Sequence, residues 1–197
     1  MSYVLVSLVG DAATEESDKF ARWLAGEIRP ARAFHDEHPE HAAVAAAVKV
    51  TPVALVICHD GGGSVRARRD GPSWADAASF ATIFSDARVW AYACNTRAPK
   101  LAEDLESFGR RAFASGVRVF AGHCSSIIAP PDAPTYPALR RAGYRALGRA
   151  MRAFLRGENR ADELRRIALR EAAASGRRAV FAAPAIEDAM NSLRVLA

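Results

Sequence analysis

Short, almost entirely apolar runs recur along the chain, and they constrain its fold more than any other feature. A strand that is apolar on both sides is typical of a parallel sheet covered by helices on both faces. Between the runs, apolar residues recur at helical spacing, as in Phe20, Trp23 and Leu24. This alternation predicts an α/β fold with a doubly wound, mostly parallel sheet. The strongest strand candidates are Tyr3–Val9, Val53–Cys58, Arg88–Ala93 and Val117–Ala121.

Capping residues and glycines mark the ends of the predicted helices. Ser73 is placed to cap a helix, with Asp76 three positions on in a capping-box arrangement. Gly116 and Gly157 stand where two helices are expected to stop. Helices are predicted over Thr14–Glu27, Glu40–Val48, Ser73–Asp86, Pro99–Ser115, Pro137–Arg156 and Ala161–Ala174, and after Pro184; short strands at Pro30–Phe34 and Ala179–Ala183; and a polar loop at Ser64–Pro72.

Length and composition limit the class of protein. The 197 residues suit one domain spanning residues 1–197. Half of the residues are hydrophobic and a quarter are charged, which excludes a disordered chain. Three cysteines, an odd number, argue against a disulfide framework and predict a cytoplasmic location. Neither a membrane helix of about 20 apolar residues nor a signal peptide is expected.

The basic residues are unevenly distributed between the two types. The formal net charge is +5, and 24 of the 27 basic residues are arginine, because lysine occurs only at positions 19, 49 and 100. Alanine is also abundant, and this pairing is typical of a GC-rich genome. The arginine excess alone therefore does not indicate a nucleic-acid partner, although a basic surface suits acidic partners.

Reactive side chains follow three of the predicted strands. His59, Cys94 and the pair His123-Cys124 each stand at a strand end. Functional groups in such folds collect at the carboxyl ends of the strands, and consecutive strands are usually neighbours. Because neighbouring strands lie about 4.8 Å apart, His59 and Cys94 are predicted to share a site.

A cysteine beside a histidine suits acyl transfer. Cysteine is strongly nucleophilic near neutral pH, and an imidazole can activate it or protonate a leaving group. Gly61 and Gly62, close behind His59, would let backbone N–H groups hold a substrate oxyanion. The competing interpretation is that Cys94 is a buried apolar side chain and His59 a packed turn residue.

Three sequence blocks around these residues resemble one peptidase family. VALVICHDGGG, RVWAYACNTR and GVRVFAGHCSSI are similar to blocks of caspase-like cysteine peptidases, particularly of the CHAT (caspase and separase related) branch. In that family one strand ends in a histidine near glycine, and a later strand ends in alanine-cysteine followed by a polar residue. The resemblance covers about residues 50–175. It implies a caspase-like fold and endopeptidase chemistry.

The resemblance also implies roles for individual residues. Cys94 would attack the scissile carbonyl of a protein substrate, and His59 would protonate the departing amine. Backbone N–H groups of Cys94 and of Gly61 or Gly62 would hold the oxyanion. Asp60 stands where the family has glycine, which changes the register of the glycines and makes Asp60 a candidate to contact the imidazole or the substrate.

The wider expectation is a cytoplasmic peptidase of a prokaryotic signalling or defence system, without metal or other cofactor. A regulatory or recruiting protein partner is expected, because the sequence contains no evident sensor domain. The alternative is a catalytically silent caspase-like fold that serves as an adaptor or interaction module.

The remaining histidines and cysteines fit other patterns less well. Gly122–Ser126 partly resembles the nucleophile elbow of α/β-hydrolases, but that fold needs a histidine after the nucleophile and none follows Cys124. Cys124 and His123 are therefore candidates for contacting substrate, with a packed turn as the alternative for His123. Pro39 interrupts the histidines at 35, 38 and 41, which argues against a metal site.

Charged residues near the strand ends and on the long helix raise questions of specificity. Asp11 follows the first strand and is a candidate to favour arginine or lysine in the substrate, or it simply caps the next helix. Arg66, Arg68 and Arg69 favour an acidic substrate residue instead. The long helix carries a face that is either solvated or a docking surface for an acidic protein or nucleic acid; its arginines are Arg140, Arg141, Arg145, Arg149, Arg152 and Arg156.

Overall fold

A single mixed sheet organises the chain in the computed structural model, which describes residues 2–60, 63–93, 108–123, 137–174 and 182–197. The sheet has eight strands, six of them in the spatial order β2-β1-β3-β6-β7-β8, and β4 and β5 extend it as a hairpin from β3. The strands are β1 (Val4–Leu8), β2 (Arg32–Asp36), β3 (Val53–Asp60), β4 (Ser64–Arg66), β5 (Ala75–Asp76), β6 (Arg88–Ala93), β7 (Val119–His123) and β8 (Leu193–Leu196).

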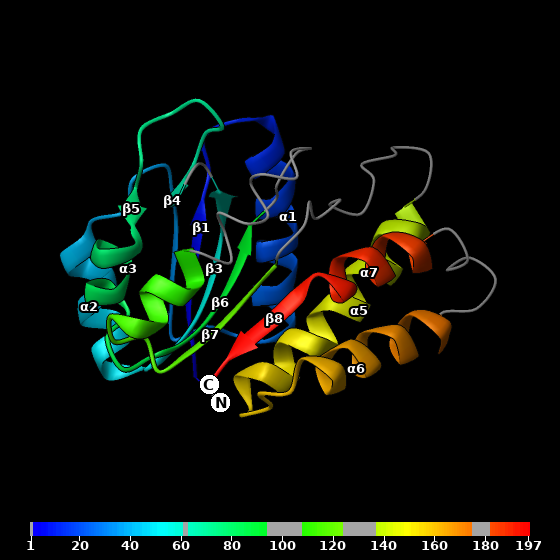
Figure 1. Ribbon diagram of the computed structural model, residues 1–197. Coiled ribbons are helices and arrows are strands. Elements are labelled where there is room, and N and C mark those ends of the chain that lie inside the picture. Colours follow the sequence, from blue (N-terminus) through cyan, green and yellow to red (C-terminus); the bar gives the residue numbers. More distant parts are fainter. Residues whose placement is uncertain (1, 61–62, 94–107, 124–136, 175–181) are drawn as a thin grey trace.

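Five neighbouring strands, from β2 at one edge to β7, run parallel, which confirms the mostly parallel sheet that the sequence predicts. β1 pairs in parallel with both β2 and β3, and β6 pairs in parallel with β3 and β7. Among the described strands, only β8 at the far edge and the β4–β5 hairpin pair antiparallel. The carboxyl ends of β1, β3, β6 and β7 therefore meet at one edge of the sheet (Figure 1).

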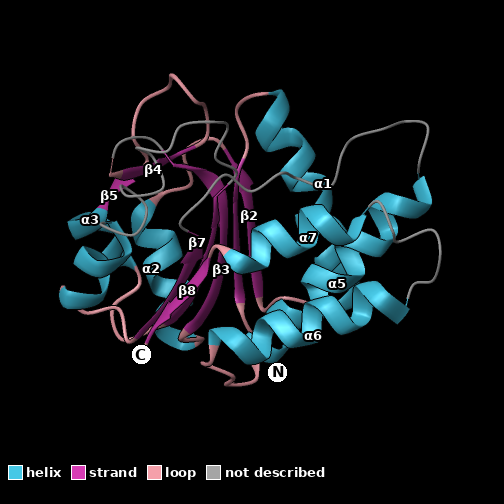
Figure 2. Cartoon of the chain, turned by 45° about the vertical axis from the view of Figure 1, so that its right-hand side comes forward, coloured by secondary structure: helices cyan, strands magenta, loops and turns pink. Residues whose placement is uncertain are grey.

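Helices cover both faces of the sheet, which Figure 2 shows nearly edge-on. Two separate apolar cores result, because successive side chains of a strand point to opposite faces. Leu55 and Ile57 of β3 join the core beneath α1 and α5, whereas Val56 and Cys58 join the core beneath α2 and α3. The helices are α1 (Ala12–Glu27), α2 (His41–Val50), α3 (Ala77–Ile83), α5 (Pro137–Leu155), α6 (Ala161–Ala174) and α7 (Ala182–Asn191), with a further helical segment over 108–114.

Most predicted elements are confirmed, with small shifts of their ends. Gly116 and Gly157 have positive φ angles of 123° and 112°, as expected of glycines that stop helices. Cys58 is fully buried in the core, as its position on the strand predicts. Residues 99–107 of one predicted helix lie outside the described residues. Among the described residues, no helix is long and apolar enough to cross a membrane.

The segment after His59 differs from the sequence prediction. β4 lies in the predicted loop, β5 lies at the start of the helix predicted from Ser73, and α3 begins only at Ala77. The cap of α3 is Asp76, whose side chain accepts a hydrogen bond from the backbone N–H of Ser79, not Ser73 as predicted. The hairpin strands are only two or three residues long, too short for a pattern of alternating polarity to reveal them.

The carboxyl-terminal region also differs. The predicted short strand is wrong in its last two residues, because Ala182 and Ala183 belong to α7, and residues 179–181 lie outside the described part. The strand is instead β8, which pairs antiparallel with β7 and closes the sheet. Only its first residue, Leu193, is fully buried, so β8 lacks the apolar signature of the central strands.

Gly122 in β7 leaves no room for a side chain. An added Cβ would lie 2.6 Å from Cε1 of Phe120, whose ring packs against Phe80 and Phe108. We expect Gly122→Ala to lower the free energy of unfolding by about 1–3 kcal/mol, the usual cost of overpacking a core. Urea denaturation measures the change. Gly26→Ala on α1, where an added Cβ meets nothing within 4 Å, is the matched control, and an equal effect of both would contradict the argument.

Candidate active site

The predicted site lies at the edge where β1, β3, β6 and β7 end. His59, Asp11 and His123 belong to the described residues there, and the backbone of Asp60 completes β3. Four of the predicted site residues lie outside the described residues, as does the side chain of Asp60: Gly61, Gly62, Cys94 and Cys124. The geometry of the site is therefore built from the first group.

His59 and Asp11 form an ion-pair-like contact across two neighbouring strands. Nε2 of His59 lies 3.0 Å from each carboxylate oxygen of Asp11. His59 is on the same face of β3 as Leu55 and Ile57, which is the face that α1 covers, and Asp11 is the residue that begins α1. The imidazole is 3% exposed.

Asp11 is fixed by further hydrogen bonds. One oxygen accepts from the backbone N–H groups of Ala13 and Thr14. The Thr14 hydroxyl oxygen in turn accepts from the backbone N–H of Asp11, which completes a capping box. The other oxygen accepts from the backbone N–H of Arg69. Partial burial acts to raise the pKa of Asp11, but the hydrogen bonds from Thr14, His59 and Arg69 outweigh it and lower that pKa to about 2. Asp11 is therefore a carboxylate at neutral pH.

This pairing selects the tautomer of His59. An ionised carboxylate only accepts hydrogen bonds, so Nε2 of His59 carries the hydrogen that Asp11 receives. Nδ1 is then the basic nitrogen of the neutral ring. An imidazole held in one orientation and one tautomer by a carboxylate is the arrangement that general acid–base catalysis requires.

Asp11 caps α1, which is one of the two roles predicted for it. It also contacts His59, and the sequence does not predict this contact. The sequence makes Asp60 the acidic candidate for the imidazole, whereas the partner in the structure is Asp11, which precedes His59 by 48 residues. The signal in the sequence is an aspartate shortly after β1, a strand that neighbours the strand of His59. Recognising it requires knowing that β1 pairs with β3.

β3 pairs with β6, the strand that directly precedes Cys94 in the sequence. Cys58 pairs with Ala93 at the end of their shared ladder. These two residues directly precede His59 and Cys94 in the sequence. The prediction that the two strands are neighbours is confirmed.

The arginines that follow His59 lie on and beside the hairpin. His59 pairs with Arg66 in the β3–β4 ladder, and Arg68 forms an ion pair with Glu37 with an N–O distance of 2.6 Å. Gly63, in the turn between the strands, has a φ of 87°, a conformation that favours glycine. Part of the glycine-rich segment therefore has a structural explanation as a hairpin turn.

His123 is a packed histidine, the alternative that the sequence allowed. It is 1% exposed, its Nε2 accepts from the indole N–H of Trp90 at 3.1 Å, and its Nδ1 lies 2.9 Å from the carbonyl oxygen of Ala189. These bonds join β6, β7 and α7. Burial lowers the pKa of His123 to about 4, although the bond to Ala189 opposes the shift. The ring is therefore neutral at pH 7.

This buried histidine predicts a loss of stability in mild acid. A histidine whose pKa falls from 6.5 in the unfolded chain to about 4 in the fold binds its proton more readily when unfolded. Stability should therefore fall as the pH drops from about 6.5 to 4, by about 3 kcal/mol in total. Urea denaturation at pH 7 and pH 4.5 measures it. His123→Gln, which does not titrate, should flatten the difference, and an unchanged pH dependence in this variant would contradict the assignment.

The three histidines at 35, 38 and 41 have separate partners. Nδ1 of His35 lies 2.5 Å from Asp18, and Nε2 of His41 lies 2.7 Å from the carbonyl oxygen of Trp74. His38 lies 3.8 Å from Glu37. Within the part of the chain that the structure describes, no group of three or more His, Cys, Asp or Glu residues is placed to hold a metal ion.

Comparisons with known proteins found no match: no protein-family model, no curated protein and no solved structure is significantly similar to this chain.

Proposed function

We propose that the chain is a cysteine endopeptidase with a caspase-like fold, in which Cys94 is the nucleophile and His59 the acid/base. The observation that carries the proposal is the His59–Asp11 pair at the end of β3, beside the strand that leads into Cys94. Cys94 directly follows Ala93, the last residue of β6, in the sequence. Cys58, the pairing partner of Ala93, is in turn joined directly to His59.

The proposed reaction uses these groups in two steps. The Cys94 sulfur attacks the carbonyl carbon of the scissile bond, and its proton passes to Nδ1 of His59. His59 then gives that proton to the departing amine as the C–N bond breaks, which leaves a thioester. Water attacks the thioester with His59 as the base, and the acid product leaves. Asp11 holds the imidazole throughout and does not exchange protons.

The fold supports the caspase-like assignment in its general plan only. A mostly parallel sheet with helices on both faces brings the histidine strand and the cysteine strand together, as the resemblance implies. The proposed substrate is a protein, and the setting is a prokaryotic signalling or defence system in the cytoplasm, with a protein that regulates the enzyme or recruits its substrate.

One observation favours a second candidate, a catalytically silent interaction module of the same fold. His59 is 3% exposed, and its pairing with Asp11 also serves to tie the start of α1 to β3. In a silent module this contact would stabilise the fold, and Cys94 would behave as an ordinary thiol.

The rate at which iodoacetamide alkylates each cysteine distinguishes the two candidates. In a peptidase, Cys94 is expected to react fastest of the three cysteines, because a nearby histidine assists formation of the thiolate. In the His59→Ala variant, alkylation of Cys94 should be slower by roughly tenfold or more. Mass spectrometry of the protein alkylated in its native state measures the rate. Equal rates at Cys94 in wild type and His59→Ala would favour the silent module.

A further inference from the structure

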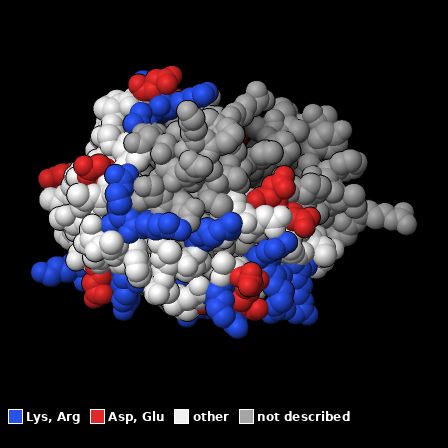
Figure 3. All heavy atoms as spheres, in the orientation of Figure 1, with Lys and Arg blue, Asp and Glu red and all other residues white. Residues whose placement is uncertain are grey.

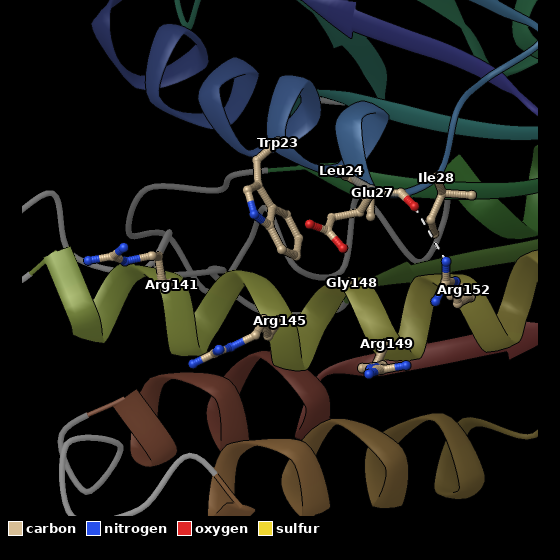
Figure 4. A pocket seen from close by; sticks show the side chains of 9 residues that line it. All are labelled: Trp23, Leu24, Glu27, Ile28, Arg141, Arg145, Gly148, Arg149 and Arg152. Carbon is tan, nitrogen blue, oxygen red and sulfur yellow. Dashed lines mark hydrogen bonds between the residues drawn. The ribbon is translucent and has the colours of Figure 1, made fainter.

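A groove runs between α1 and α5, on the face of the sheet covered by both helices (Figure 4). Its volume is about 230 Å³. Trp23 and Glu27 reach from α1 toward α5, and Leu24 and Ile28 form apolar parts of the wall. The α5 side is lined by Gly148 and by four arginines, Arg141, Arg145, Arg149 and Arg152.

The apolar part of the groove is rigidly built. The ring of Trp23 stacks on Phe20 with centroids 6.0 Å apart and lies 5.6 Å from the ring of Tyr144. An added Cβ at Gly148 would lie 2.9 Å from Cζ3 of Trp23, so glycine is what lets the indole approach α5 this closely. The groove thus combines a fixed aromatic surface with a row of cations.

The positive charge of Arg145, Arg149 and Arg152 is only partly compensated by described residues. Arg149 lies 3.5 Å from Glu171, and Arg152 donates to the carbonyl oxygen of Glu27 at 3.4 Å. No carboxylate of the described residues pairs with Arg145. Arginines on α6 do have carboxylate partners: Arg166 binds Glu163 at 2.6 Å, and Arg165 lies 3.9 Å from Glu187. Elsewhere on the surface, too, blue and red atoms lie side by side (Figure 3).

We propose that this groove binds an extended acidic segment of a partner protein, with carboxylates on the arginines and apolar side chains against Trp23. Three of the arginines follow one another at intervals of four residues and so recur about every 6 Å along α5: Arg141, Arg145 and Arg149. Alternate residues of an extended peptide recur about every 6.6 Å on one side. Acidic residues at alternate positions therefore match successive arginines, and each pair can form charge-assisted hydrogen bonds.

Glu27 favours a peptide over a nucleic acid as the occupant. Its carboxylate points into the groove, where it can accept a hydrogen bond from a bound segment (Figure 4). A peptide backbone supplies N–H donors beside its acidic side chains. A phosphodiester backbone supplies only acceptors, each next to a negative charge that Glu27 would repel. This inference concerns binding alone and stands whether or not the chain is a peptidase.

Fluorescence anisotropy with a labelled heptapeptide of alternating glutamate and leucine tests the proposal. We expect binding that weakens as salt rises, and a Kd raised roughly fivefold by Arg145→Gln, as loss of one charged contact predicts. Arg118→Gln, which removes an exposed arginine just before β7, is the matched control and should leave the Kd within about twofold. The glutamine–leucine heptapeptide should not bind.

Nuclear magnetic resonance locates the peptide. The indole N–H signal of Trp23, assigned with Trp23→Phe, should shift on titration. The signals of Trp74 and Trp90 should not, because both indoles are buried and hydrogen bonded to Pro39 and His123 respectively. Four results would each overturn the proposal. The peptide does not bind, or Arg145→Gln and Arg118→Gln weaken its binding equally. The signal shifts are confined to Trp74 or Trp90, or a single-stranded oligonucleotide of equal charge binds more tightly than the peptide.

Discussion

Replacing Cys94 with alanine is expected to abolish peptide-bond cleavage and to leave the fold intact. The variant removes the only atom proposed to bond to the substrate carbon, and loss of a catalytic nucleophile costs at least roughly 10³-fold in rate. A single sulfur is lost directly after β6, whose six residues are all buried. Cleavage of a peptide library by wild type and variant, beside urea denaturation of both, measures the two parts of the prediction.

The other two cysteines supply controls for this experiment. Cys58 is buried in the core on the face of β3 opposite to His59, so Cys58→Ala should lower stability while cleavage continues. Cys124→Ser should also retain measurable cleavage, because Cys124 is at most a substrate contact. Near wild-type activity in Cys94→Ala would refute the proposed dyad. Activity lost in all three variants would point to a general effect on folding.

The central sheet could be predicted because its strands are buried on both faces. A run such as Arg88–Ala93 needs no knowledge of its neighbours to be recognised, and β6 has these bounds. The β4–β5 hairpin and β8 could not be predicted in this way. They are short, partly exposed and held by pairing to β3 and β7, and a partner distant in sequence leaves no local pattern.

The candidate site could be predicted from the sequence where it depends on the central strands, and not where it depends on contacts with other elements. The position of His59 at a strand end, and the pairing of its strand with the one before Cys94, follow from apolar runs and right-handed crossovers. The role of Asp11 does not, because it depends on where α1 starts relative to β3. The burial of His123 also depends on Trp90 and Ala189, which two other elements supply.

Asp11→Asn is expected to lower the cleavage rate roughly 10²–10⁴-fold while changing stability by only about 1 kcal/mol. Asparagine caps helices as well as aspartate does, so the bonds to Ala13 and Thr14 survive. The negative charge that orients His59 and selects its tautomer is lost, and loss of such a carboxylate has effects of this size. Rates measured from pH 4 to 9 should show no ionisation of Asp11 in wild type, because its pKa is about 2.

Thr14→Ala separates helix capping from positioning of the imidazole. Thr14 Oγ1 accepts from the backbone N–H groups of Gly10 and Asp11, donates to the carbonyl oxygen of Ala67 and lies 3.1 Å from Oδ1 of Asp11. In Thr14→Ala the Asp11 carboxylate keeps its hydrogen bonds from the backbone N–H groups of Ala13 and Thr14 and its contact with His59. This variant should lose about 1–2 kcal/mol of stability, the usual cost of losing a cap, and retain most of its activity. If Asp11→Asn and Thr14→Ala lose activity equally, Asp11 acts only as a helix cap. If Asp11→Asn is far slower than Thr14→Ala at equal stability, the carboxylate acts through His59.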